Sequence, residues 1–221
     1  MEVPGVALIN NIQRGERNMK QLKVRLTFTE KCLGTANNNP DIHRDFIASK
    51  APDAVTREEE IEAIGAEEYE EKQMTVFPRL DGGPMFWDYQ IKGFFKDTCS
   101  ALQRCKGEDF SKETCKIKAY KKVIDGCIFV EPRKIPIDMH GGEMGYLQRP
   151  LRGQTAQGER IALATSETIP AGSTIDIAIT CLSDSHVNAV IEWLNYGKWK
   201  GIGQWRNASF GRFTYELMEM A

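Results

Sequence analysis

The chain has 221 residues, of which 41% are apolar and 27% charged, which is typical of one large folded domain or a compact pair. A formal net charge of −2 excludes recognition of a partner by overall charge alone. No apolar run approaches the ~20 residues that span a bilayer, and nothing resembles a signal peptide, so we expect a cytoplasmic protein without a membrane contact.

The cysteines show no spacing typical of a metal or redox site. None form C-x-x-C, and no histidine stands at zinc-ligand spacing from any of them. We therefore expect reduced, mostly buried thiols, with no metal and no cofactor, at Cys32, Cys99, Cys105, Cys115, Cys127 and Cys181.

The N-terminal third contains one clear strand. Residues 1–18 show no sustained period and are interpreted as an extension before a single domain, 19–221. Apolar residues alternate with polar ones over 22–28, which predicts a half-buried strand. A short helix is expected over 41–51, followed by an acidic insertion at about 53–73, in which a single basic residue, Arg57, stands against Asp53, Glu58, Glu59, Glu60, Glu62, Glu67, Glu68, Glu70 and Glu71.

The middle of the chain predicts a hairpin followed by helices. Two β-prone runs surround Asp-Gly-Gly within 74–90, which indicates a β-hairpin. Helical spacing of apolar residues predicts an amphipathic helix over 91–104. A second helix is expected in the lysine-rich stretch 112–125, and 127–138 has the composition of an edge strand.

The last third predicts two strands, a helix and a closing strand. Alternation indicates strands around 161–165 and 175–181 with a turn at 169–173, and a helix that Asp184 or Ser185 can cap. A strand over 212–217 ends the pattern. The element order predicts an α+β fold, with a ferredoxin-like (RRM-like) antiparallel sheet and helices on one face.

The segment "GIGQWRNASFGRF" (201–213) is rich in glycine, aromatic and basic residues and contains no acid. It is not a P-loop, because no Lys-Ser or Lys-Thr follows and no helix opens. It is not a dinucleotide fingerprint either, since Arg206 occupies the third glycine position. Two interpretations stay open: a tight structural turn with core aromatics, or a nucleic-acid contact.

The second interpretation uses three kinds of group. Glycines such as Gly201 and Gly203 let a backbone approach phosphates closely. Aromatic rings can stack on bases, here Trp199, Trp205 and Phe210. The cations that can contact phosphates are Lys198, Lys200, Arg206 and Arg212.

A second polar segment, 147–163, is predicted to be a loop. It alternates arginines with glutamines, and both side chains suit phosphates and base edges. We expect contact with nucleic acid or a protein partner, rather than simple solvation, at Arg149, Arg152 and Arg160.

Three motifs resemble the RAMP superfamily, the backbone and RNA-processing subunits of CRISPR systems. The segment 201–213 is similar to the family's C-terminal glycine-rich loop, with Ser209 where a glycine is usual. "DYQIKGFFKDTCSAL" (88–102) has the Lys-Gly step of the family's strand-to-helix turn, although the family's serine pair is absent. "SETIPAGSTIDIAI" (166–179) is similar to the hairpin before the family's last helix.

The resemblance implies a ferredoxin-like fold that binds RNA, with Lys92, Lys96, Arg206 and the loop glycines near its backbone. It also implies head-to-tail homo-oligomers in some members. The chain is further similar to proteins of gut bacteriophages and prophages, which places it in the cytoplasm of a bacterial host. The expected partners are RNA or single-stranded DNA, and a CRISPR or other host defence protein.

Some relatives cut RNA, and His43 and Asp41 lie where a catalytic histidine or aspartate would be sought. We interpret His43 as a surface or capping residue, His140 as a turn residue and His186 as structural. The sequence therefore favours a non-catalytic RNA- or single-strand-binding protein. The alternatives are a phage anti-defence protein that acts by protein contact, through the acidic segment, and a metal-independent endoribonuclease.

Overall fold

The computed structural model describes residues 20–37, 74–155 and 158–220. Its central feature is a four-stranded sheet in which all neighbouring strands are antiparallel. The strands lie side by side in the order β12 (Phe213–Met220), β1 (Lys20–Phe28), β11 (Thr174–Cys181) and β7 (Ile128–Glu131). The strands predicted over 22–28, 175–181 and 212–217 are therefore confirmed.

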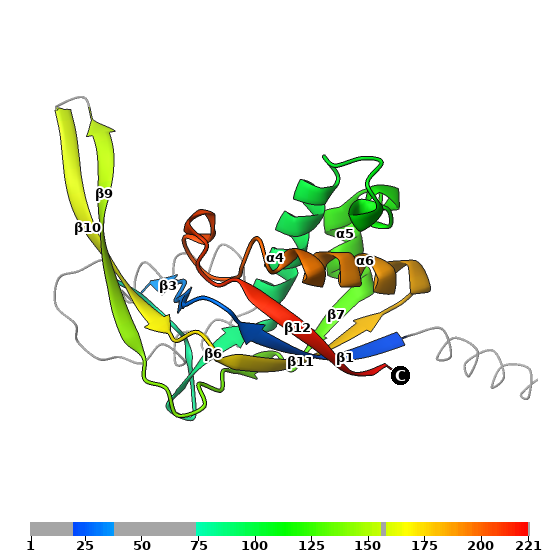
Figure 1. Cartoon of the computed structure of the whole chain (residues 1–221), viewed down its shortest axis with the longest axis horizontal. Coiled ribbons are helices and arrows are strands. Elements are labelled where there is room, and N and C mark those ends of the chain that lie inside the picture. Colours follow the sequence, from blue (N-terminus) through cyan, green and yellow to red (C-terminus); the bar gives the residue numbers. More distant parts are fainter. Residues whose placement is uncertain (1–19, 38–73, 156–157, 221) are drawn as a thin grey trace, which may run out of the picture.

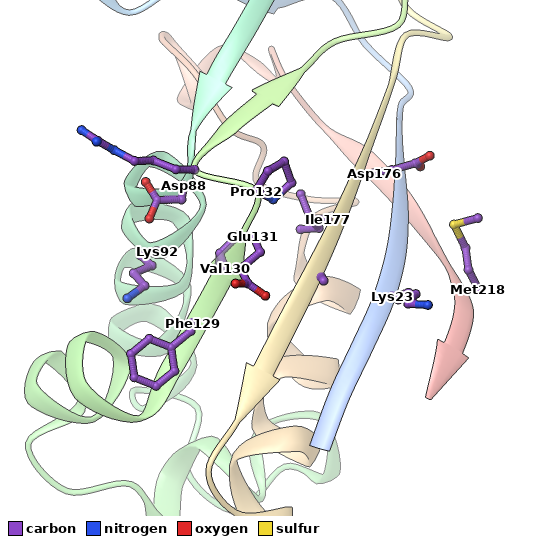
Figure 2. A pocket seen from close by; sticks show the side chains of 12 residues that line it. Lys23, Asp88, Lys92, Phe129, Val130, Glu131, Pro132, Asp176, Ile177 and Met218 are labelled. Carbon is purple, nitrogen blue, oxygen red and sulfur yellow. The ribbon is translucent and has the colours of Figure 1, made fainter. Parts of the chain in front are cut away.

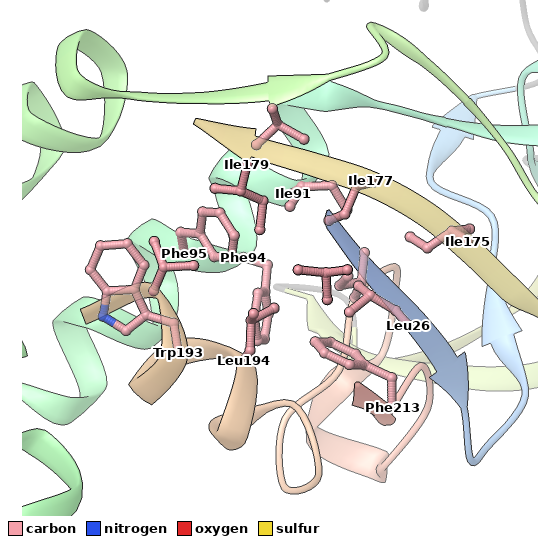
Figure 3. Close-up of a cluster of buried hydrophobic side chains, with 14 of the residues drawn as sticks. Leu26, Ile91, Phe94, Phe95, Ile175, Ile177, Ile179, Trp193, Leu194 and Phe213 are labelled. Atoms are coloured by element: carbon pink, nitrogen blue, oxygen red, sulfur yellow. The ribbon is translucent and has the colours of Figure 1, made fainter. Parts of the chain in front are cut away.

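Two helices cover one face of this sheet, as Figure 1 shows. They are α4 (Asp88–Leu102) and α6 (Asp184–Tyr196). Strand β1 turns its alternate apolar residues toward them, and each of these is fully buried: Leu22, Val24, Leu26 and Phe28. Figure 3 shows the packing between the two helices and the sheet, where Phe94, Phe95 and Trp193 lie in one cluster with the isoleucines of β11. Burial of these rings together with the aliphatic residues of the sheet stabilises the sheet–helix layer.

Helix α4 begins three residues earlier than predicted, at Asp88 rather than at 91. The reason is local, because Gln90 in the first turn accepts a hydrogen bond from the Trp87 backbone N–H at 2.7 Å through its side-chain oxygen. The predicted hairpin before it is confirmed: β5 (Arg79–Leu80) pairs with β6 (Gly83–Trp87) across Asp81 and Gly82. Both turn residues have positive φ, as a two-residue hairpin turn requires.

The segment between α4 and the edge of the sheet is more broken than predicted. In place of one helix over 112–125 there are two 3-10 turns, η1 (Asp109–Ser111) and η2 (Thr114–Lys116), and the helix α5 (Tyr120–Cys127). The strand expected over 127–138 is divided into β7 and β8 (Lys134–Pro136), with Pro132, which has no N–H to donate, between them.

A second sheet carries a long hairpin that extends away from the body (Figure 1). The hairpin, called the arm below, consists of β9 (Gly145–Thr155) and β10 (Gly158–Ile169). The base of β10 pairs with β2 (Cys32–Leu33) and with β4 (Met74–Val76), which in turn pairs with β3 (Ala36–Asn37). The turn predicted at 169–173 lies between β10 and β11.

The arm corrects the prediction of a loop over 147–163. Its register runs without interruption from Gly158 opposite Thr155 to Thr168 opposite Gly145. Backbone groups form this ladder, so a polar sequence does not prevent it. Pro150 is accommodated because β9 pairs only with β10 and is an edge strand. Segments 1–18, 41–51 and 53–73 lie outside the described residues.

A buried carboxylate fixes the base of the arm. Glu167 of β10 is only 5% exposed. It accepts a hydrogen bond from the Phe77 backbone N–H at 2.8 Å and pairs with the Arg79 guanidinium at 2.5 Å. The buried Glu167 carboxylate therefore holds the arm to the β4–β5 segment. Because a buried charge is costly without partners, the contact requires both the Phe77 N–H and Arg79.

We expect Glu167→Ala to lower the free energy of unfolding by about 3 kcal/mol, because it leaves the Phe77 N–H and Arg79 without their acceptor. Urea denaturation measures the loss. Glu143→Ala is the control, since Glu143 is exposed and makes no ion pair among the described residues. Equal midpoints for the two variants would show that Glu167 does not anchor the arm.

Candidate nucleic-acid interface

The loop between α6 and β12, residues 197–212, is called the closing loop and crosses itself near its two ends. Ile202 N–H donates to Gly211 O at 3.0 Å, and a Cβ on Gly201 or Gly211 would overlap the backbone of the other segment. Gly203, at φ +93°, lies against the Leu33 backbone, and Gln204 N–H donates to Leu33 O at 3.3 Å. These glycines serve the close packing of the loop itself.

The glycines and the side chains of the closing loop have different roles. A Cβ at Gly201 or Gly203 would meet the protein's own backbone, so close packing explains these glycines, and their contact with nucleic acid stays a prediction. The loop stays a candidate interface because of the side chains that it carries. Figure 1 shows the ribbon of this loop between α4 and the arm.

Trp205 is the most prominent of these side chains. It is 44% exposed and sits at a positive φ of +53°. Its ring is stacked on Phe210, with centroids 5.2 Å apart and planes 16° from parallel. The Arg149 guanidinium of the arm lies 4.5 Å from the centre of the Trp205 ring. The structure thus brings together two predicted site residues, Arg149 and Trp205, from segments far apart in the sequence.

Polar groups behind the ring join the loop to the arm. The side-chain oxygen of Gln204 accepts hydrogen bonds from Thr75 of β4, Ser166 of β10 and Arg149 of β9, at 3.3, 3.4 and 3.3 Å. Arg149 is not satisfied by this bond. Its Nε and Nη1 are buried and find no hydrogen-bond partner among the described residues. Buried donors left unpaired cost free energy, and an anionic ligand is one way to satisfy them.

The remaining predicted cations of the loop differ in their surroundings. Lys200 Nζ and Arg206 Nη1 both contact the same oxygen of Asp97, on α4, at 2.8 and 2.9 Å. Lys198 is exposed with its ammonium 4.2 Å from the centre of the Trp199 ring. Arg212 has a buried Nε without a hydrogen-bond partner in the part of the chain described here. No pattern in the sequence indicated Asp97 or Gln204, because each is defined by its partners in space.

The two predicted lysines of α4 make their contacts elsewhere. Lys96 pairs with Asp125 of α5 at 2.6 Å. Lys92 donates to the Asp125 backbone oxygen at 3.5 Å and lies 5.1 Å from the centre of the Phe129 ring. Both therefore face α5 and β7, and the structure does not bring them to the closing loop.

Several other predicted residues are not placed. Arg152 and Arg160 belong to the arm strands by register, opposite Ile161 and Gly153, but their side chains lie outside the described ones. His43 and Asp41 fall outside the described residues entirely.

The two described histidines fit structural roles. His140 stands in a turn at φ +49°, with Nδ1 3.2 Å from Asp138 and Nε2 3.0 Å from the Thr174 hydroxyl. Burial lowers the pKa of His186.

The open face of the four-stranded sheet has a hollow of about 750 Å³, which Figure 2 shows. Its walls include Phe129 and Met218, and Ala178 of a central strand lines it. The described central strands offer no aromatic ring to this face. Arg25 and Asp176 there bind each other through two hydrogen bonds of 2.7 Å, and this pairing lowers the pKa of Asp176. The aromatic ring at this face is Phe129 of the edge strand β7, and it already has the Lys92 ammonium 5.1 Å from its centre.

Three buried cysteines have thiol pKa values that differ from the usual one, and in each the change disfavours the reactive thiolate. Burial raises the pKa of both Cys99 and Cys181 to about 12 and that of Cys32 further. They therefore stay protonated and unreactive at neutral pH. In the described part of the chain no three potential ligand side chains form a metal-binding group, and no helix there is long and apolar enough to cross a membrane.

Comparisons with known proteins add little to this geometry. No protein-family model matches the chain, and no curated protein matches its sequence. Among solved structures, the chain is similar to one in a cryo-EM structure of the type III-B Cmr-beta bound to cognate target RNA, with a TM-score of 0.47 and 10% identity. That similarity covers 100% of this chain and 67% of the other. The function must be argued from this chain's own residues.

We expect Gly211→Ala to lower the free energy of unfolding by about 3 kcal/mol or more, because the new Cβ overlaps Ile202 and the residue has a positive φ. Gly93→Ala, in α4, has open space around the new Cβ and should instead stabilise the protein by about 1 kcal/mol. Thermal unfolding of both variants checks the pair. A Gly211→Ala variant as stable as the parent would disprove the crossing.

Proposed function

We propose that this protein binds RNA or another single-stranded nucleic acid through the closing loop and the base of the arm, without catalysis of its own. The fold suits the RAMP-like, ferredoxin-like assignment suggested by the sequence motifs. Helix α4 lies between β1 and β7 in the chain, α6 lies between β11 and β12, and the sheet order is β12-β1-β11-β7. That is the connectivity of a βαββαβ unit.

The observation that carries the proposal is the group formed by Trp205, Phe210 and Arg149. An exposed indole already stacked on one ring offers a surface on which an unpaired base can stack. The neighbouring Arg149 guanidinium carries the positive charge that attracts a phosphate. Stacking on a base requires no particular sequence, so we expect weak base preference.

The setting that fits this activity is CRISPR-related defence or phage nucleic-acid metabolism in the cytoplasm of a bacterial host. Support comes from the three motifs of 88–102, 166–179 and 201–213, which correspond to the start of α4, the segment from β10 through the turn into β11, and the closing loop. In this setting the natural ligand is a strand of RNA, and neighbouring protein subunits share it.

The stacking role predicts that Trp205→Ala weakens binding of a labelled 12-nucleotide RNA by about 5- to 150-fold, corresponding to about 1–3 kcal/mol for one stacked base. Fluorescence anisotropy at low salt measures the affinity, with single-stranded DNA of the same sequence in parallel. Phe110→Ala is the control, because Phe110 is a 50% exposed aromatic in η1, away from the closing loop. No affinity of the parent protein for either polymer would overturn the proposal, as would equal binding by the two variants.

The charge role predicts a smaller salt dependence for Arg149→Ala. The slope of log affinity against log salt should fall by roughly 0.7, the loss of one phosphate contact with a single strand. Arg104→Ala, which removes an exposed cation just after α4, should leave the slope unchanged. An unchanged slope for Arg149→Ala would contradict the role. A stable host-protein complex that survives nuclease treatment, in a protein without affinity for RNA, would favour the anti-defence alternative.

A further inference from the structure

Asp97 occupies an unusual position among the charges of the closing loop. It projects from α4, and one of its carboxylate oxygens contacts both Lys200 Nζ at 2.8 Å and Arg206 Nη1 at 2.9 Å. All three side chains are partly open to solvent, with exposed fractions of 26% for Lys200, 34% for Arg206 and 35% for Asp97. The group is therefore at the surface, where a dissolved anion can reach it.

The charges of this group do not balance. Two cations share one carboxylate, which leaves a net charge of +1 at the group. Arg206 directly follows Trp205 in the chain, so the backbone that carries this surplus charge is continuous with the backbone that carries the stacking ring. Lys198, next to the same loop, adds a further exposed cation. A ligand that stacks a base on Trp205 thus carries its phosphates into a region of positive potential.

We propose that Lys200 and Arg206 form a phosphate subsite adjacent to the Trp205 surface, and that Asp97 occupies this subsite in the free protein as an internal competitor. The inference rests on the proposed function and deepens it, because it identifies what regulates affinity at that interface. The carboxylate oxygen of Asp97 takes the place that a phosphate oxygen takes in the complex. The two anions repel each other, so the phosphate displaces Asp97 from at least one of the cations.

The elements that carry these groups decide which side moves. Asp97 lies on α4, whose neighbouring residues Phe94, Phe95 and Thr98 are buried in the core, so its backbone is fixed. Lys200 and Arg206 are on the closing loop and reach Asp97 with long side chains that have several rotatable bonds. We therefore expect the two cationic side chains to move: they turn away from Asp97 on α4 and toward the phosphates of the bound RNA, and the loop stays folded.

Asp97→Asn tests the subsite, since it keeps the shape of the side chain and removes the competing charge. We expect the 12-nucleotide RNA to bind about two- to fivefold more tightly, the range that corresponds to partly exposed ion pairs. The salt slope should steepen by about 0.7, because one more net charge is neutralised by the strand. Asp176→Asn is the matched control, because it also frees an arginine, Arg25, but on the open face of the sheet.

A role of Asp97 that is only structural gives the opposite result. If the carboxylate merely fastens the loop to α4, Asp97→Asn weakens binding and lowers the melting temperature, and the inference is overturned. It is also overturned if Asp176→Asn increases affinity as much as Asp97→Asn does. Asp97→Ser removes the same charge with a smaller side chain and repeats the measurement if the asparagine variant fails to fold.

A double-mutant comparison identifies the cations. In the Arg206→Ala background, the gain from Asp97→Asn should shrink to less than half, since one of the two freed cations is missing. A full gain in that background would show that Asp97 acts elsewhere. The outcomes also separate this inference from the proposed function. A parent protein without RNA affinity refutes both, whereas binding that depends on Trp205 but ignores Asp97→Asn refutes the subsite alone.

Discussion

The contact between Gly201 and Gly211 is the constraint on which the interface depends. The two ends of the closing loop approach so closely that neither position has room for a Cβ. This crossing sets the path from α6 into β12 and so completes the central sheet. It also confines the intervening residues to a short, tightly bent excursion, in which Trp205 and Ser209 both take positive φ values. Strained non-glycine residues of this kind cluster at functional sites in proteins.

Two separate parts of the fold hold the side chains of the closing loop in place. Gln204 connects the loop to β4 and to both strands of the arm, whereas Lys200 and Arg206 connect it to α4. The indole of Trp205 consequently has the Arg149 guanidinium of the arm 4.5 Å from its centre. A base-stacking surface with charge beside it, fixed by a packed scaffold, needs little reorganisation when a strand binds.

The two faces of the sheet have different chemistry, and this explains why the interface lies at its end. One face is filled by the apolar residues of α4 and α6. The other carries alternating polar residues of β1 and β11, and its best-placed arginine, Arg25, is already bound to Asp176. The central strands offer no aromatic ring to the open face, whereas the closing loop presents the stacked, exposed rings of Trp205 and Phe210 with cations nearby, which favours the loop as the surface for a nucleic acid.

The sequence by itself determined the elements whose signal is periodic. The alternation in 22–28 and 175–181 and the helical spacing in α4 and α6 predicted the core correctly, because burial imposes those periods on neighbouring residues. In the arm, the alternation around 161–165 correctly predicted part of β10. The rest of 147–163 was predicted to be a loop because a backbone ladder does not require apolar side chains. Residue type was enough to predict Trp205, Arg206 and Arg149 as candidate site residues, but it did not predict which residues they contact. Only the tertiary structure decided that Arg149 lies over Trp205, that Asp97 holds two of the predicted cations, and that the glycines serve packing. Those contacts join segments distant in the chain, and no local pattern records which of them meet.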